Sequence, residues 1–286
     1  MHLKKWFLFI LFSCFIASCS LVKTGYNNAP TLVIWWLDDY FSLTQVQKLA
    51  LKPSLQNLHN WHRQNQLPNY LTQLQNSQKS LGNEQISATE VCEKLDLTRT
   101  SIGTLQAESI PIIVDVAPLL SDKQMQRFQT KLAERAEKWK EEWWQDSKEK
   151  QLDARLEKTQ DFAEKIYGGL SDGQLMLLKQ RLEQADINPA ISYKEIQRRN
   201  DDAFNILTTL QNEALTTDEK TQLVKAGFGR LQNSPNQDYQ TYADKLTNHT
   251  CETMASLHAS SNAQQKLHAK YWLQDYINLI KALQIK

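Results

Sequence analysis

Apolar side chains recur every three or four residues along most of the chain, which is the spacing of one face of an α-helix. The clearest stripe begins after residue 122 and places six residues on one face: Met125, Phe128, Leu132, Ala136, Trp139 and Trp143. The stripe continues past residue 150, so the pattern predicts one long helix over 122–167. The same spacing predicts eight further helices, over 44–65, 68–81, 88–108, 172–185, 190–213, 218–232, 237–259 and 263–284.

Several of these helix starts carry a motif of leucine, then serine or threonine, then glutamine or glutamate three residues further on. It occurs as Leu43-Thr44 to Gln47, Leu120-Ser121 to Gln124, Leu170-Ser171 to Gln174 and, more loosely, Leu215-Thr216 to Glu219. The motif is typical of a capping box, in which hydroxyl and amide side chains satisfy two free backbone amides. The leucines are 77, 50 and 45 residues apart, too irregular for a solenoid. Each motif therefore predicts a helix start and not a repeating unit.

Prolines and glycines modify this prediction at three places. Pro53 falls inside the first helix and is expected to kink it, and Gly168-Gly169 is expected to end the long helix. The strand-like run Ile110–Val116 contains one proline and is closely followed by another, so it is predicted to be a short buried connector. The last two helices, within 237–286, are predicted to form a hairpin.

Composition supports an all-α fold. Glycine and proline together are 15 of 286 residues, about 5%, against roughly 12% in average usage. So few turn-forming residues argue against sandwiches and barrels. We expect a single elongated bundle of about nine helices over residues 31–286. The formal charge is +1, from 33 basic and 32 acidic residues, so no nucleic-acid partner is expected.

The N-terminus has the pattern of an export signal. Lys4 and Lys5 precede an apolar run over 6–16, which is too short to span a bilayer. The run ends in Ile16-Ala17-Ser18-Cys19, which resembles a bacterial lipobox. That resemblance implies removal of residues 1–18, attachment of a diacylglycerol and a further fatty acid such as palmitate to Cys19, and a tether over 19–30. A plain signal peptide or an uncleaved anchor is the alternative.

The residue after Cys19 bears on the destination of the protein. Aspartate at that position resembles an inner-membrane retention signal in enterobacteria, and this chain has Ser20 instead. We therefore expect an outer-membrane anchor with the body facing the periplasm. In that oxidising compartment the two cysteines beyond the anchor, Cys92 and Cys251, either pair with each other or remain separate buried thiols. The sequence does not choose between these alternatives.

Residues typical of catalysis or metal binding are sparse. The sequence contains no glycine-rich phosphate loop, no HExxH and no GxSxG. His59 and His62 have a spacing that can share a metal, but no third ligand is evident, and a polar helix face beside Trp61 is the simpler interpretation. Asp38-Asp39 is interpreted as a capping pair or as a partner of Arg63. We expect no metal, no cofactor, no catalytic residue and no enzyme activity.

Tryptophans are the remaining candidates for a functional surface. Those considered are Trp35, Trp36, Trp61, Trp139 and Trp143. Large aromatic side chains at helical spacing commonly pack in the core or between helices. Alternatively, an exposed group of them would form an apolar contact surface for a partner protein or an unfolded chain.

Distinctive residues cluster after the lipobox. They are Tyr26-Asn27-Asn28, Trp35-Trp36-Leu37-Asp38-Asp39-Tyr40, Leu43-Thr44 with Gln47, and Trp61-His62-Arg63 followed by Leu67-Pro68 and Tyr70. These segments, with the later motifs at Leu120-Ser121 and Leu170-Ser171, resemble an uncharacterised family of proteobacterial lipoproteins with a single domain of unknown function. The resemblance implies an all-helical, membrane-tethered protein with no established activity.

The leucine–threonine–glutamine motif is also similar to that of the periplasmic stress proteins of the Spy and CpxP type, which carry an LTxxQ motif. Those proteins are helical, bind unfolded or sensor proteins and need no cofactor. We therefore expect a lipid-anchored module that binds a protein partner or client in the periplasm, with a chaperone-like role in envelope stress. The alternative is a structural or assembly factor of the envelope with one dedicated partner.

Overall fold

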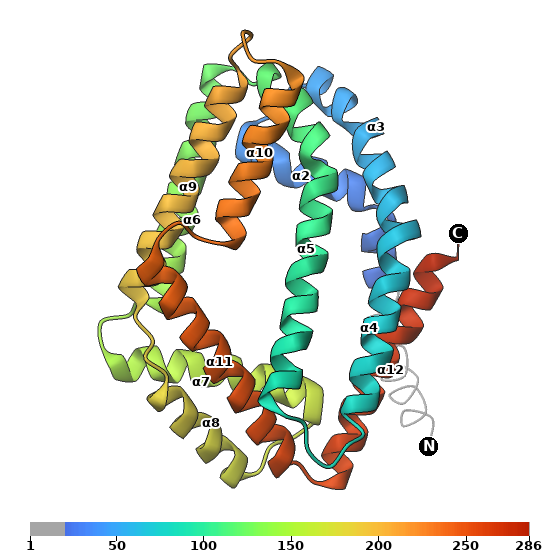
Figure 1. Ribbon diagram of the computed structural model, residues 1–286, viewed down its shortest axis with the longest axis vertical. Helices are drawn as coiled ribbons and strands as arrows, with labels where there is room; N and C mark the ends of the chain where they lie inside the picture. Colours follow the sequence, from blue (N-terminus) through green and yellow to red (C-terminus); the bar gives the residue numbers. More distant parts are fainter. Residues whose placement is uncertain (1–20, 286) are drawn as a thin grey trace, which may run out of the picture.

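The computed structural model describes residues 21–285, and in this range it is built from helices without a strand (Figure 1). The predicted signal peptide and Cys19 lie outside the described residues. Residues 21–27 are helical and lead into eleven α-helices, two more than the approximate number expected. The helices are α2 (Ala29–Phe41), α3 (Gln45–Trp61), α4 (Leu67–Ser80), α5 (Ala88–Val116), α6 (Asp122–Trp143), α7 (Lys148–Tyr167), α8 (Asp172–Gln184), α9 (Pro189–Leu210), α10 (Thr217–Gln232), α11 (Gln237–Ser260) and α12 (Ala263–Gln284). The all-α class is confirmed.

The single long helix predicted over 122–167 is wrong. The chain forms α6 and α7, which run in different directions in Figure 1. The helix α6 ends at Trp143, and the Ser147 side chain caps α7 by accepting a hydrogen bond from the Lys150 amide at 3.2 Å. The sequence stripe did not reveal the break because this cap has lysine, instead of glutamate or glutamine, at its third position.

The connector predicted over Ile110–Val116 is also wrong, because this segment is the last part of α5. Pro111 lies inside the helix, and Ile110 and Val114 are buried. A 3₁₀ turn, η2 (Ala117–Leu119), follows. By length and composition the helical segment Ala88–Leu119 is long and apolar enough to cross a membrane. One such helix is only weak evidence for a membrane span, because core helices of soluble proteins pass the same test.

Two further differences concern helix continuity. The helix α3 runs through Pro53 without interruption and joins α4 through a π-turn, η1 (His62–Gln66), so the first two predicted helices form one continuous helical segment. The predicted C-terminal hairpin does not pack as one. The helices α11 and α12 diverge in Figure 1, with α11 against α5 and α8, and α12 against α4 and α7.

The two halves of the chain repeat one arrangement of four helices. In the first half α2 packs against α3 and α6, and α3 packs against α5; in the second, α7 packs against α8 and α12, and α8 against α11. The two halves also pack against each other: α6 of the first half contacts α9 of the second, and α12 of the second half contacts α4 of the first. The irregular spacing of the sequence motif hid this internal repeat.

Each half contains a buried pair of glutamines from two capping boxes that face each other. The side-chain amides of Gln47 and Gln124 exchange hydrogen bonds of 3.1 and 2.8 Å. In the second half Gln174 and Gln265 do the same at 3.0 and 2.8 Å. The capping box that supplies Gln265 begins at Asn262, whose side chain accepts a hydrogen bond from the backbone amide of Gln265. The sequence motif did not include this box, because asparagine stands where the motif has serine or threonine.

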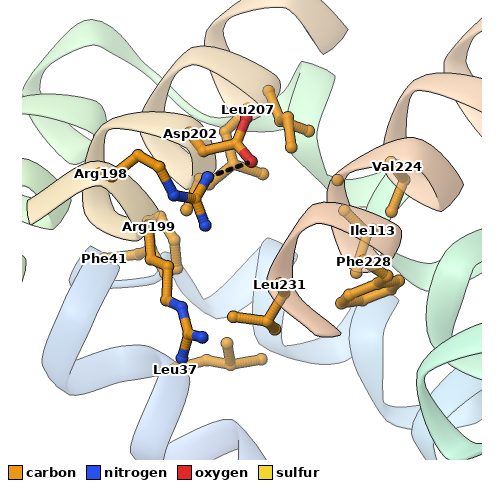
Figure 2. A pocket seen from close by; sticks show the side chains of 13 residues that line it. Leu37, Phe41, Ile113, Arg198, Arg199, Asp202, Leu207, Val224, Phe228 and Leu231 are labelled. Carbon is orange, nitrogen blue, oxygen red and sulfur yellow. Dashed lines mark ion pairs between the residues drawn. The ribbon is translucent and has the colours of Figure 1, made fainter. Parts of the chain in front are cut away.

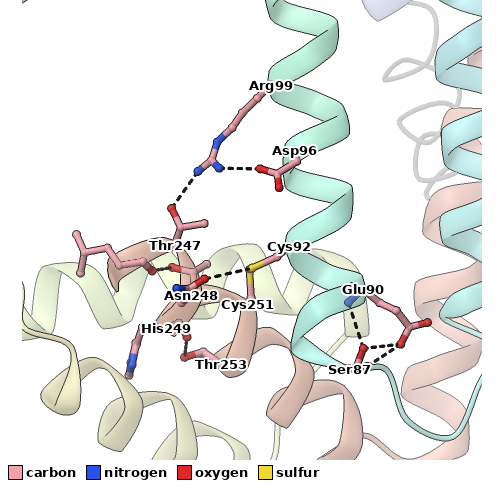
Figure 3. The surroundings of a disulfide bond; sticks show 12 residues. Ser87, Glu90, Cys92, Asp96, Arg99, Thr247, Asn248, His249, Cys251 and Thr253 are labelled. Atoms are coloured by element: carbon pink, nitrogen blue, oxygen red, sulfur yellow. Dashed lines mark hydrogen bonds and ion pairs between the residues drawn. A yellow bond between two sulfur atoms is a disulfide. The ribbon is translucent and has the colours of Figure 1, made fainter. Parts of the chain in front are cut away.

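A disulfide joins the two halves. Cys92 on α5 and Cys251 on α11 have their Cα atoms 5.5 Å apart and are separated by 159 residues (Figure 3). Of the two alternatives left open by the sequence, the structure has the paired cysteines. Beside them Arg99 donates to Asp96 on its own helix and to the Thr247 hydroxyl on α11, so a polar contact accompanies the covalent one.

Candidate functional site

An apolar pocket lies between α2, α5, α9 and α10, with a volume of about 270 Å³ (Figure 2). Its walls are almost entirely aliphatic and aromatic: Leu37, Phe41, Ile113, Ala203, Ile206, Leu207, Val224, Phe228 and Leu231. On α9 and α10 these residues follow the three- and four-residue spacing of one helix face. The pocket is therefore where the apolar stripes of four helices meet without filling the space between them.

One glycine sets the width of the gap between α9 and α10. A Cβ atom at Gly227 would lie 2.3 Å from Cδ1 of Ile206, so a larger residue requires Ile206 to move. Ile206 itself lines the pocket. The close approach of the two helices at Gly227 thus fixes the shape of the pocket wall.

Arginines flank the pocket on α9. Arg198 and Arg199 donate three hydrogen bonds of 2.8–2.9 Å to Glu195, which is only 2% exposed, and the Ser234 hydroxyl donates a fourth. Burial opposes ionisation of Glu195, but the hydrogen bonds from the two arginines and Ser234 outweigh it and lower its pKa. Glu195 is therefore a carboxylate that holds both guanidinium groups in place.

The charges at this end of the pocket do not cancel. Arg230 on α10 makes a bidentate contact with Asp202, with hydrogen bonds of 2.7 and 3.0 Å, and Arg198 lies 3.6 Å from the same carboxylate. Three arginines thus face two carboxylates, Glu195 and Asp202, which leaves one net positive charge. In Figure 2 the Arg199 side chain reaches toward Leu37 on α2. The arrangement suits an apolar group with an acidic group beside it.

A second cluster fixes the N-terminal segment to the body. The Tyr26 hydroxyl lies 3.0 Å from Nδ1 of His62, and its ring packs on His59 with the centroids 4.7 Å apart. Arg63 lies over the Tyr26 ring and donates to the Asn27 side chain at 2.8 Å. Much of the segment interpreted as a tether is therefore helical and clamped.

His59 and His62 of this cluster are both half-buried. Burial lowers the pKa of both His59 and His62, and the positive charge of Arg63 adds to the effect at His59. Nε2 of His59 is buried without a hydrogen-bond partner. Among the described residues no three histidine, cysteine, aspartate or glutamate side chains gather as they would around a metal ion.

Of the two interpretations of Asp38-Asp39, capping or pairing with Arg63, the pairing is wrong. Asp38 pairs with Lys48 at 2.8 Å, and Asp39 lies 3.3 Å from Lys131. The reason is that the C-terminal end of α2 faces α3 and α6, whereas Arg63 on η1 donates to the Leu283 carbonyl at the end of α12.

The structure does not gather the candidate tryptophans into one surface. Trp35 and Trp36 on α2 are 65% and 55% exposed, whereas Trp61, Trp139 and Trp143 are half-buried. Trp139 stacks on Tyr193 of α9, and Arg155 of α7 lies over Trp143. The tryptophans of α6 therefore pack the corner between helices, and those of α2 remain on the surface.

Sequence reasoning missed the pocket. Its residues come from four helices and span positions 37 to 231, so no local motif contains it. The only sequence signal was the stripe of apolar residues after Arg198-Arg199 on one predicted helix. That stripe alone does not distinguish a pocket wall from ordinary core packing.

Comparisons with known proteins give a family without a function. The model of a family of unknown function, DUF6279, matches residues 39–226. No curated protein and no solved structure matches the chain. The matched range contains α5 and α9 in full and the first part of α10, so it includes all of the pocket lining except Leu37, Gly227, Phe228 and Leu231.

Proposed function

The chain belongs to DUF6279, a family of unknown function. For this member of the family we propose a lipid-anchored module that binds other proteins without catalysing a reaction. In this proposal Cys19 carries the acyl chains, the anchor lies in the outer membrane and the helical body faces the periplasm. The role is chaperone-like: the protein holds client chains during envelope stress.

The observation that carries the proposal is the apolar pocket with its flanking arginines. Its lining offers aliphatic and aromatic surface together with Arg198, Arg199 and Asp202, and contains no serine, cysteine, histidine or lysine to act as a nucleophile. Apolar side chains of a partner would gain from leaving water, at about 25 cal/mol per Å² of buried apolar area. The excess positive charge favours segments in which an acidic residue adjoins the apolar ones.

An aggregation assay with several unrelated denatured clients tests this proposal. We expect the protein to suppress aggregation at near-stoichiometric amounts. Ala203→Phe, which fills the pocket from α9, should weaken suppression at unchanged fold, as judged by circular dichroism. Met176→Ala is the matched control, because Met176 on α8 is exposed and does not line the pocket.

The outcome also separates the chaperone-like role from that of a dedicated factor. Suppression that Ala203→Phe leaves intact would refute the pocket as the client site. If no client is protected, the general chaperone role is refuted, and the alternative of a structural or assembly factor with one partner follows. That alternative predicts a single discrete adduct when a photo-crosslinking residue replaces Leu231, a partly exposed residue at the pocket, in cells.

A further inference from the structure

One face of α2 carries large apolar side chains in contact with solvent. Leu32 is 43% exposed, Val33 37%, Trp35 65% and Trp36 55%. We refer to these four residues as the α2 outer face. The opposite side of the same helix is buried, because Ile34 and Phe41 belong to a core cluster with Leu51 and Phe128. Rotation of α2 would expose that core, so the outer face is held outward.

Exposed apolar residues are concentrated in this part of the chain. Of the nineteen large apolar side chains that are exposed among residues 21–285, six lie within residues 21–36 and thirteen within the remaining 249. Leu21 and Val22 are the other two of the six. Between residues 21 and 37 the only charged side chain is Lys23. The solvent-facing side of a helix usually carries mostly charged and polar side chains.

The outer face has polar residues at its end. Asp39 lies one turn beyond Trp35 and Trp36, and it contacts Lys131 at 3.3 Å and Arg127 at 3.9 Å, both on α6. Basic side chains thus adjoin the apolar face, paired with Asp39 and, for Lys131, also with Glu134. This combination of an apolar face and flanking cations is typical of helices that lie in the plane of a membrane surface.

The proposed anchor brings this face close to a bilayer. Leu32 is thirteen residues after Cys19, and thirteen residues rise about 20 Å as a helix. Residues 21–27 are helical and clamped to the body through Tyr26, so this short connection has little freedom to carry α2 away from the anchor.

We infer that the α2 outer face lies in the interfacial region of the same bilayer that holds the Cys19 acyl chains, and that it orients the body on the membrane. The inference rests on the proposed anchor for the position of the bilayer. Tryptophan favours the interface because its ring is apolar while its indole N–H can bind a headgroup or water. A lipid surface fits better than a client protein because the tether holds the face at the bilayer continuously.

Tryptophan fluorescence of the full, processed protein in vesicles of phosphatidylethanolamine and phosphatidylglycerol tests the inference. Brominated acyl chains quench only tryptophans at the membrane. Two of the seven tryptophans after residue 18 lie on the outer face, so we expect the quenched fraction to fall about twofold or more in Trp35→Phe/Trp36→Phe. The matched control, Trp143→Phe/Trp144→Phe, removes two tryptophans at the end of α6 and should retain the quenching.

Two outcomes would overturn the inference. The first is absence of lipid quenching while mass spectrometry finds the acylated Cys19, which leaves the anchor proposal intact. The second is protection of Trp35 and Trp36 from aqueous iodide by a client protein but not by vesicles. If Cys19 is not acylated, the anchor proposal fails instead. In that case the same quenching measurement with added vesicles decides the remaining part of the inference, that the α2 outer face binds a bilayer surface: dependence on Trp35 and Trp36 supports it, and the absence of such dependence refutes it.

Discussion

Replacing Gln47 by leucine is expected to destabilise the protein strongly, because this side chain makes four hydrogen bonds in a buried place. Its Oε1 accepts from the Thr44 amide at 2.9 Å and from Gln124 at 2.8 Å, and its Nε2 donates to the Leu119 carbonyl at 2.7 Å and to Gln124 at 3.1 Å. Leucine retains the volume but leaves these partners without Gln47. An unpaired buried polar group costs about 1–3 kcal/mol, and burial of the leucine side chain offsets part of the total. We therefore expect the free energy of unfolding to fall by about 3 kcal/mol.

A double-mutant cycle with Gln124→Leu tests the reasoning more sharply than either variant alone. The second replacement removes a group that the first has already left unpaired, so the double variant should cost at least about 1 kcal/mol less than the sum of the single ones. The measurement is urea denaturation followed by circular dichroism, with the disulfide intact. Gln126→Leu is the matched control, because Gln126 is an exposed glutamine on α6 and should change stability by less than about 0.5 kcal/mol. Strict additivity, or a loss from Gln47→Leu no larger than the control's, would refute the assigned role of the pair.

Three other predictions concern stability. Reducing the Cys92–Cys251 bond, which closes a loop of 159 residues, should lower the free energy of unfolding by up to about 5 kcal/mol on the chain-entropy account, and equal urea midpoints with and without reductant would contradict this. Burial lowers the pKa of His258 below its ordinary value of 6.5, so the unfolded chain takes up a proton first and stability should fall as pH drops below about 6.5; His258→Asn should flatten the dependence of Tm on pH. Gly229→Ala meets open space and should add about 0.5–1 kcal/mol from helix propensity, whereas Gly227→Ala should not, because its methyl group meets α9; equal gains in thermal melts would argue against that close approach.

Local chemistry explains what the sequence predicted correctly. Thr44, Ser121, Ser171 and Thr216 each cap a helix with the glutamine or glutamate three residues further on, and both halves of such a cap lie within four residues. The starts of those helices were therefore predictable. The helix α2 was not predicted, because Asn28 at its start makes no side-chain cap.

Contacts between distant residues account for the rest. The motif predicted that Gln47 and Gln124 would cap helices, and they do, but nothing local indicates that the two amides face each other across 77 positions. The pocket has the same origin, because its walls come from α2, α5, α9 and α10. Adjacent stripes of apolar residues establish that helices pack, and the space left between them depends on details such as the close approach at Gly227.

The hydrogen bond from Arg63 to the Leu283 carbonyl links residues 220 positions apart, beside the Asn27 side chain that the same guanidinium holds. This long sequence separation affects the order in which the chain can fold. During synthesis the segment around Asn27 emerges early, yet its clamp is complete only when α12 has been made. The packing of α12 on α4 and the closing of the Cys92–Cys251 loop are delayed in the same way. A growing chain therefore leaves α4 and the N-terminal segment without their final partners until α12 has been made, and the docking of this helix is a late step of assembly.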